Sequence, residues 1–203
     1  YDRRRQRQMC IRDSINASDL ALKSKMPGQK IKFLNIDGQN LKLEEMKGEK
    51  GTLIIFSCNT CPWVIRWEDR YVDISKKYIP KGIGMVAINS NAAKFDREDS
   101  IIEMRSHAAK NKYNFPYVQD KNSKLAKLFG ATKTPHIYLF DSNDILVYKG
   151  AIDDNARNKN KVKESYLSSA LDNMLEGLPI KNSETKALGL SLIHISEPTR
   201  PVV

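Results

Sequence analysis

Cysteine is scarce in this sequence, since three cysteines among 203 residues are too few for a framework of several disulfides. Histidine is equally rare, with three residues. Long apolar runs are absent, so that no segment predicts a membrane-spanning helix, and there are no internal repeats or low-complexity tracts. The 40% of hydrophobic residues can still form a core, and the length fits one domain.

Both ends of the chain have the sequence of translated adapter DNA. The stretches LSLIHISEPTR (190–200) and RRQRQMCIRD (4–13) each match a reading frame of a common transposase-type sequencing adapter. We therefore interpret residues 1–14 and 190–203 as non-native and residues 15–189 as a single domain. For the N-terminal stretch, the alternative is a native basic arm that binds nucleic acid. The natural N-terminus would lie outside this sequence, which leaves a cytoplasmic and a periplasmic location equally open.

The positive charge of the chain comes partly from its N-terminal end. Residues 1–14 carry five arginines and two aspartates, and residues 190–203 carry one glutamate and one arginine, so the formal net charge of +10 falls to +7 for residues 15–189. The remaining excess consists of single lysines along predicted helices and loops. This distribution is typical of a solvated surface, and we expect no nucleic-acid partner.

Hydrophobic patterning predicts alternating strands and helices. The predicted strands are a hairpin at 30–43 and single strands at 51–58, 82–91, 115–120, 136–140 and 145–150, and the predicted helices are 62–80, 98–112, 123–129 and 161–176. This order predicts an α/β domain with a central mixed sheet flanked by helices on both sides and an N-terminal β-hairpin.

Cys58 and Cys61 lie between a buried strand and a helix that Pro62 opens. Unpaired backbone N–H groups at a helix start stabilise a thiolate, and both this position and the C-x-x-C spacing lower the pKa of a cysteine. Two intervening residues let the sulfurs meet in one helical turn, so the pair can cycle between dithiol and disulfide. We therefore predict a redox-active pair that needs no cofactor.

Two other interpretations of the pair are weaker. A zinc site needs about four ligands. The two histidines of the domain, His107 and His136, lack the spacing of a zinc-binding pair. Two small buried hydrophobic residues could share the same spacing by chance. The position between a buried strand and a helix favours redox chemistry, because it is the context of a thioredoxin-like C-x-x-C motif.

Four motifs together carry a resemblance to a known family: C-N-x-C-P at 58–62, W-E-D-R at 67–70, T-P-H at 134–136 and G-A-I-D-D-N at 150–155. The chain resembles the thioredoxin-like redoxin family, which includes alkyl hydroperoxide reductase and thiol-specific antioxidant domains, and most closely a bacterial subgroup of it. The similarity covers residues 25–189. It implies a thioredoxin fold, thiol-dependent antioxidant or exchange activity, and protein dithiols, protein disulfides or peroxide as partners.

The resemblance also implies a substrate-binding surface. Thioredoxin folds carry a cis-proline before a strand, facing the C-x-x-C motif, and here that residue is Pro135, preceded by Thr134. The alternative is an ordinary trans-proline at a strand start. Trp63 is a further candidate for the substrate-facing surface. His136 is a weaker candidate because a residue at its position more often packs in the interior.

The family pattern leaves two assignments of the nucleophile. By the thioredoxin pattern Cys58 attacks and Cys61 resolves, whereas by the peroxiredoxin pattern T-x-x-C-P Cys61 is peroxidatic. We favour exchange with Cys58 as the more reactive thiol, because we expect Cys61 to lie one turn inside the helix. A thiol peroxidase is the nearest alternative, and a redox-inert binding module is an alternative of another class.

The sequence departs from the thioredoxin pattern around the pair. Ser57 stands where thioredoxin has a tryptophan, and Thr52 stands where it has a buried aspartate that accepts a proton. The remaining acidic candidates are Asp153 and Asp154. Their setting in a polar loop favours a simpler role in turning that loop.

Overall fold

The sheet is built around two parallel strands, β3 (Gly51–Ser57) and β4 (Ile83–Asn89), which pair residue for residue. The computed structural model describes residues 19–192, so the predicted non-native segment 1–14 and most of 190–203 lie outside the described residues. All seven residues of β3 are buried. Burial on both faces explains why this strand reads as a continuous apolar run without alternation.

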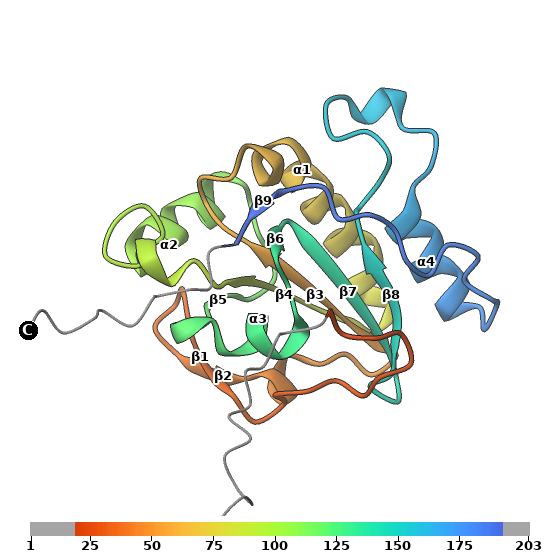
Figure 1. Cartoon of the computed structure of the whole chain (residues 1–203), viewed down its shortest axis with the longest axis horizontal. Coiled ribbons are helices and arrows are strands. Elements are labelled where there is room, and N and C mark those ends of the chain that lie inside the picture. Colours follow the sequence, from red (N-terminus) through yellow and green to blue (C-terminus); the bar gives the residue numbers. More distant parts are fainter. Residues whose placement is uncertain (1–18, 193–203) are drawn as a thin grey trace, which may run out of the picture.

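Five further strands complete a seven-stranded mixed sheet in the order β2-β1-β5-β4-β3-β7-β8 (Figure 1). They are β1 (Lys32–Asn35), β2 (Asn40–Lys42), β5 (Tyr117–Gln119), β7 (His136–Asp141) and β8 (Leu146–Gly150). The pairs β3–β4 and β4–β5 are parallel, and β1–β2, β1–β5, β3–β7 and β7–β8 are antiparallel. The predicted mixed sheet and its N-terminal hairpin are confirmed.

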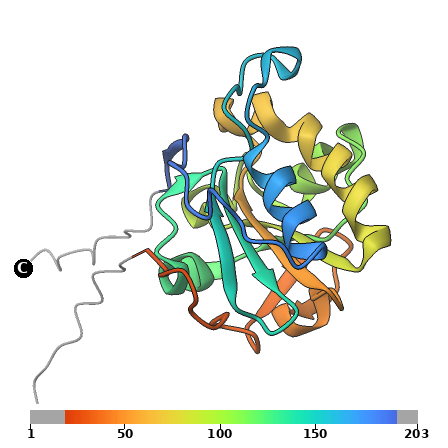
Figure 2. The ribbon, with the colours of Figure 1, turned by 90° about the vertical axis from the view of Figure 1, so that its right-hand side faces the viewer.

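Helices cover both faces of the sheet. One face carries α1 (Pro62–Tyr78), α2 (Ile101–Lys110) and α4 (Tyr166–Leu175), and the other carries the short α3 (Lys124–Phe129). Figure 2 shows α1 and α4 on one side of the strands and α3 on the opposite side. Alternate residues of β3 point into the two layers: Leu53 and Ile55 pack with α1, whereas Ile54 and Phe56 pack with α3. This is the architecture of a thioredoxin fold.

The last helix begins five residues later than the sequence predicts. A helix from Lys161 was expected, but α4 begins at Tyr166, and residues 159–161 form a separate 3₁₀ turn. The intervening backbone is bonded elsewhere: the N–H of Lys163 donates to Asp154 Oδ1, and the N–H of Asp154 donates to the carbonyl of Glu164. These bonds to Asp154 compete with helical ones and hold the segment extended.

The chain returns to the sheet after α4. Residues 183–185 bond to the backbone of Lys149, and the two-residue strand β9 (Leu190–Ser191) then pairs antiparallel with β6 (Lys133–Thr134). Figure 1 shows this segment crossing from α4 to β6. β9 falls in the segment 190–203 that the sequence assigns to adapter DNA, and its pairing does not test that assignment because backbone hydrogen bonds do not depend on side-chain identity.

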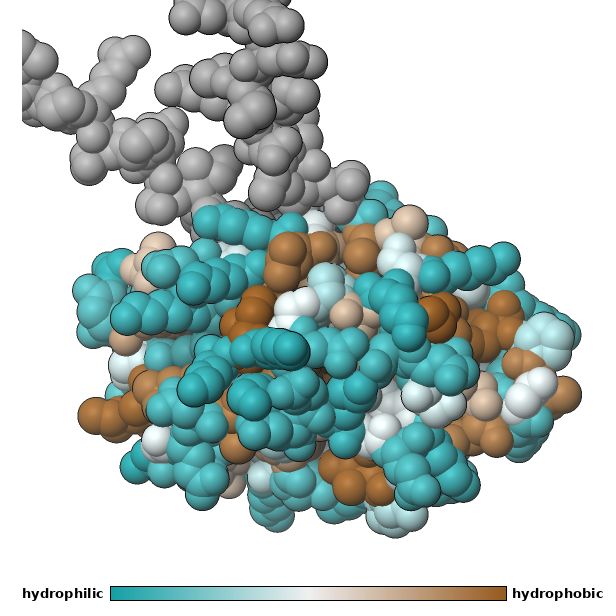
Figure 3. Space-filling view, turned by 90° about the horizontal axis from the view of Figure 1, so that it is seen from below, coloured by the Kyte–Doolittle hydropathy of each residue, from teal (hydrophilic) through white to brown (hydrophobic). Residues whose placement is uncertain are grey.

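Polar side chains dominate one face of the molecule. The face in Figure 3 is mostly hydrophilic with small scattered hydrophobic patches, in keeping with lysines spread over a solvated surface. Within residues 19–192, none of the helices has the length and hydropathy that crossing a bilayer requires.

Candidate functional site

Cys58 and Cys61 are free thiols at the carboxyl end of the central strand. Cys58 directly follows β3, and Cys61 is the N-cap residue of α1, with Pro62 as its first residue. The expectation that Cys61 lies one turn inside the helix is therefore wrong, because the extended backbone of Cys61 (φ −74°, ψ 119°) delays the helix to the proline. Both cysteines are nearly inaccessible, at 5% and 3% exposure.

Thr134 contacts both sulfurs. The Cys61 thiol donates to the Thr134 carbonyl at 3.1 Å, and Cys58 Sγ lies 3.6 Å from Thr134 Oγ1. The register of β3 with β7, which pairs Phe56 with His136, brings these segments together. The Thr134–Pro135 peptide bond is cis, and both residues are buried. The loop with the proline thus lies directly against the cysteine pair.

The two thiols differ in acidity. A hydrogen bond from Cys58 is the main cause that lowers the pKa of Cys61 to about 5, assisted by Thr134 and the backbone N–H groups of Val64 and Leu190 against the cost of burial. The same hydrogen bond to Cys61, together with burial, raises the pKa of Cys58. The start of α1 explains the direction, because a helix N-terminus favours negative charge. In the fully protonated pair the Cys61 thiol donates to the Thr134 carbonyl; once the pair has lost one proton, Cys61 is the thiolate and the remaining proton is on Cys58.

The residue after Cys58 is anchored by a buried carboxylate. The Asn59 N–H donates to Asp99 Oδ1 at 2.9 Å, and Asp99 itself is completely buried. Asp99 was missed by the sequence analysis, which placed it inside a predicted helix at 98–112. α2 instead begins at Ile101 with Ser100 as its N-cap, so Asp99 lies before the helix and turns inward. Its one signal in the sequence is the Asp-Ser pair, a common helix start.

Trp63 and His136, the other two candidates for the substrate surface, differ in burial. Trp63 is half-buried on the first turn of α1, with the Arg66 guanidinium 5.3 Å from its ring centre. His136 is buried against Tyr138, whose hydroxyl lies 3.2 Å from its Nδ1. Burial lowers the pKa of His136 to about 4, so the ring is neutral at physiological pH. His136 packs in the interior.

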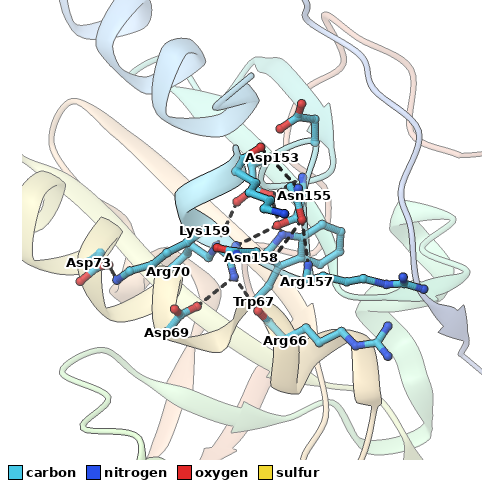
Figure 4. Close-up of polar contacts among 12 residues, drawn as sticks. Arg66, Trp67, Asp69, Arg70, Asp73, Asp153, Asn155, Arg157, Asn158 and Lys159 are labelled. Carbon is cyan, nitrogen blue, oxygen red and sulfur yellow. Dashed lines mark hydrogen bonds and ion pairs between the residues drawn. The ribbon is translucent and has the colours of Figure 1, made fainter. Parts of the chain in front are cut away.

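Asp153 and Asp154 organise the loop after β8. Asp153 is buried and accepts a hydrogen bond from Trp67 Nε1 at 2.8 Å, and it forms an ion pair with Arg70 Nε at 3.0 Å. Arg70 also donates to the carbonyl of Asn155. Figure 4 shows this cluster joining α1 to the loop. Asp154 is exposed and accepts from the Lys163 N–H. The W-E-D-R and G-A-I-D-D-N motifs thus meet in space.

An open groove of about 720 Å³ begins at Asn59 and Thr60, the residues between the cysteines. Its far wall is formed by residues 97–98 and by α2, including Arg97, His107 and Lys110. Among residues 19–192, no group of three or more histidines, cysteines or acidic residues could hold a metal ion.

Comparisons with known proteins agree with this architecture. A family model described as Redoxin matches residues 21–166. A conserved protein from Geobacillus kaustophilus, described as uncharacterized, is 36% identical with a TM-score of 0.78, and the match covers 85% of this chain and 91% of that one. A hypothetical protein from Sinorhizobium meliloti 1021 is 26% identical with a TM-score of 0.80, covering 89% and 98%. A secreted disulfide oxidoreductase from Mycobacterium tuberculosis, 12% identical with a TM-score of 0.55 over 71% and 96%, shares the fold. No curated protein matches the chain.

Proposed function

Since this chain belongs to the redoxin family and is a thioredoxin-like oxidoreductase, we propose that it exchanges electrons with partner dithiols and disulfides through Cys58 and Cys61. The observation that supports the proposal is the placement of two free thiols between the end of β3 and the start of α1, with both sulfurs against Thr134. The lowered pKa of Cys61 supports it as the attacking residue, in place of Cys58, which the sequence favoured.

The proposed cycle begins with the Cys61 thiolate. It attacks one sulfur of a partner disulfide, forms a mixed disulfide and releases the first partner thiolate. Cys58 then gives its proton to the released first partner thiolate and attacks the Cys61 sulfur, which releases the second partner thiolate and leaves a Cys58–Cys61 disulfide. The partner gains two electrons and the chain loses two. Partner oxidation is the same sequence in reverse.

A thiol peroxidase is the second candidate, and the low pKa of Cys61 together with the burial of both sulfurs favours it. Here the Cys61 thiolate attacks one peroxide oxygen, breaks the O–O bond and becomes a sulfenic acid, while the leaving oxygen takes a proton. Cys58 then condenses with the sulfenic acid to give the disulfide and water. An external thiol must reduce that disulfide.

The two candidate functions are distinguished by which substrate, insulin disulfides or hydrogen peroxide, the dithiol form reduces faster. We expect Cys58→Ser and Cys61→Ser each to abolish reduction of insulin disulfides. Stopped-flow oxidation by hydrogen peroxide would instead survive in Cys58→Ser, as accumulating sulfenic acid, if the chain is a peroxidase. Exchange that persists without Cys61 would overturn the assignment of Cys61 as the attacking residue. Failure in both assays by the intact dithiol protein would favour a redox-inert binding module.

A further inference from the structure

Asp99 is a fully buried carboxylate within one peptide unit of Cys58. Its Oδ1 accepts hydrogen bonds from the Asn59 N–H at 2.9 Å and from Asn89 Nδ2 at 2.8 Å, and its Oδ2 accepts from Asn91 Nδ2 at 2.8 Å. Each of these partners is a donor. That arrangement suits an ionised carboxylate, which can only accept.

The peptide between Cys58 and Asn59 is held firmly against this carboxylate. The Asn59 side chain donates to the carbonyl of Glu98 at 2.8 Å and accepts from the Tyr117 hydroxyl at 2.9 Å. Asn59 is therefore fixed by its backbone and by both ends of its amide. The position of Cys58 relative to the charge on Asp99 is fixed as a result.

The charge of Asp99 acts on Cys58. A nearby negative charge disfavours a thiolate, and salt screens a buried charge only weakly. Asp99 bonds to the peptide that carries Cys58 and contributes to the raised pKa of that thiol. Cys61 lies at the start of α1, where the helix favours negative charge.

We propose that Asp99 is a positioning residue of the redox pair, whose buried carboxylate holds the Cys58–Asn59 peptide and keeps the shared proton on Cys58. Cys61 then carries the thiolate. In this way Asp99 reinforces the preference for Cys61 as the attacking residue, which the position of Cys61 at the start of α1 also favours. Asp99 lies in the connection between β4 and α2, whereas Thr52 lies within β3.

The other titratable and charged groups around the pair are neutralised, paired or solvated. Burial raises the pKa of three tyrosines, so they are neutral at physiological pH: Tyr71, Tyr113 and Tyr117. Glu68 is paired with His107 at 2.8 Å. The basic groups reach outward, where Lys94 donates to Thr60 Oγ1, Lys133 donates to the Ala187 carbonyl and Arg66 lies over Trp63.

The test compares single-cysteine proteins, in which Cys58 titrates without its partner. In Cys61→Ser, the rate of Cys58 alkylation by iodoacetamide is followed against pH, with and without Asp99→Asn. The amide keeps an oxygen for the Asn59 N–H and Asn89, and the Asn91 amide can turn to accept from the new N–H. The control is Asp120→Asn, another buried carboxylate, which accepts from Leu125 N–H, Ala126 N–H and Ser90 Oγ.

We expect Asp99→Asn to raise the Cys58 alkylation rate at neutral pH about tenfold, since one pKa unit corresponds to a tenfold change in thiolate. Asp120→Asn should leave the profile unchanged. In the protein with both cysteines, Asp99→Asn should move labelling from Cys61 toward Cys58. A folded Asp99→Asn protein with an unchanged Cys58 profile would overturn the proposal.

A measurement with Asp99 intact covers the case in which Asp99→Asn does not fold. Coupling between two groups is reciprocal, so the ¹³C carboxyl resonance of Asp99 in Cys61→Ser should shift with the pH midpoint of Cys58 alkylation. A resonance that does not move through that midpoint would overturn the proposal. The inference rests on the proposed function only for the reaction in which the Cys61 thiolate attacks a substrate. Alkylation requires neither partner nor turnover, so a failure of thiol exchange would be distinguishable from a failure of this role for Asp99.

Discussion

The indole nitrogen of Trp67 donates to Asp153 Oδ1 at 2.8 Å, which ties the middle of α1 to the loop that follows β8. The same carboxylate pairs with Arg70 at 3.0 Å. Because Cys61 caps the start of α1, this contact also fixes the helix on which the redox site depends. Asp153 thus supports the site through the helix without lying among its reacting atoms.

Removal of the Asp153 carboxylate should be strongly destabilising. Asp153→Ala removes the buried partner of the Arg70 guanidinium, which keeps only the exposed Asp69 as an ion-pair partner, and breaking a buried pair typically costs about 3–5 kcal/mol. The melting temperature should fall by roughly 6 °C or more for a domain of this size. Thermal unfolding measures it, with Asp154→Ala as the matched control, because Asp154 is exposed and should cost about 1 kcal/mol or less. Equal effects of the two variants would argue against the buried cluster.

Alkylation of the reduced protein at neutral pH should label Cys61 before Cys58. The pKa of Cys61 is lowered to about 5, so its thiolate is fully formed at pH 7 and its reactivity should decline as the pH falls through 5. The raised pKa of Cys58 keeps that thiol protonated over the same range. Peptide mapping after brief iodoacetamide treatment reads out the order. Labelling of Cys58 first would restore the thioredoxin-like assignment.

Thr134→Val should make both thiols less acidic. Its hydroxyl lowers the pKa of Cys58 and of Cys61, and valine keeps the side-chain shape while removing the donor. We expect the pH midpoint of Cys61 alkylation to rise by a few tenths of a unit to about one unit, the effect of losing one hydrogen bond. Thr132→Val changes an exposed threonine nearby and should leave the midpoint in place. No difference between the two variants would contradict the role of the Thr134 hydroxyl.

Ending the chain at Gly189 should speed alkylation by bulky maleimides more than alkylation by iodoacetamide. This change removes β9, which pairs with Thr134, the residue that contacts both sulfurs. If residues 190–203 are non-native, the melting temperature should stay within a few degrees. A loss of roughly 10 °C or more, equivalent to several kcal/mol, would show that they pack natively.

The control for this truncation is a chain that ends at Asn182. It also loses Thr185, whose Oγ1 accepts from the Ala151 N–H and lies 2.9 Å from the Tyr148 hydroxyl. Several such hydrogen bonds, at about 0.5–1.5 kcal/mol each, should make this chain clearly less stable than the one ending at Gly189. Equal melting temperatures would contradict the anchoring of residues 183–185.

Local patterns were sufficient to predict the fold. The apolar run of β3, the Asp37-Gly38 turn of the first hairpin and the glycine that ends α3 each act within a few residues. The start of α4 could not be read in this way. It depends on Asp154, which lies nine residues before Lys163 and bonds to its backbone. A contact between residues this far apart in the sequence produces no periodic pattern of hydrophobic residues.

The site was predicted in part. The spacing of Cys58 and Cys61 identified the candidate pair, and Thr134 followed from the resemblance. Asp99 was not predicted because it is 41 positions from Cys58 in the sequence. Its contact with the Asn59 N–H depends on how β4 and α2 are connected. The order of the thiol acidities also depends on groups that only the folded chain assembles, including Thr134 and the N–H of Val64.

The pairing of β9 with β6 affects protein substrates and small peroxides unequally. A partner that binds as an extended segment along Thr134 competes with β9, which belongs to the same chain and is therefore present at a high effective concentration. Its apparent dissociation constant is the intrinsic one divided by the fraction of molecules in which β9 has detached. A peroxide forms no strand, so that fraction does not enter its binding in this way. In this chain the detachment equilibrium of the two-residue strand would then set the preference between protein and small-molecule oxidants, and a chain that ends at Gly189 would lack this competition.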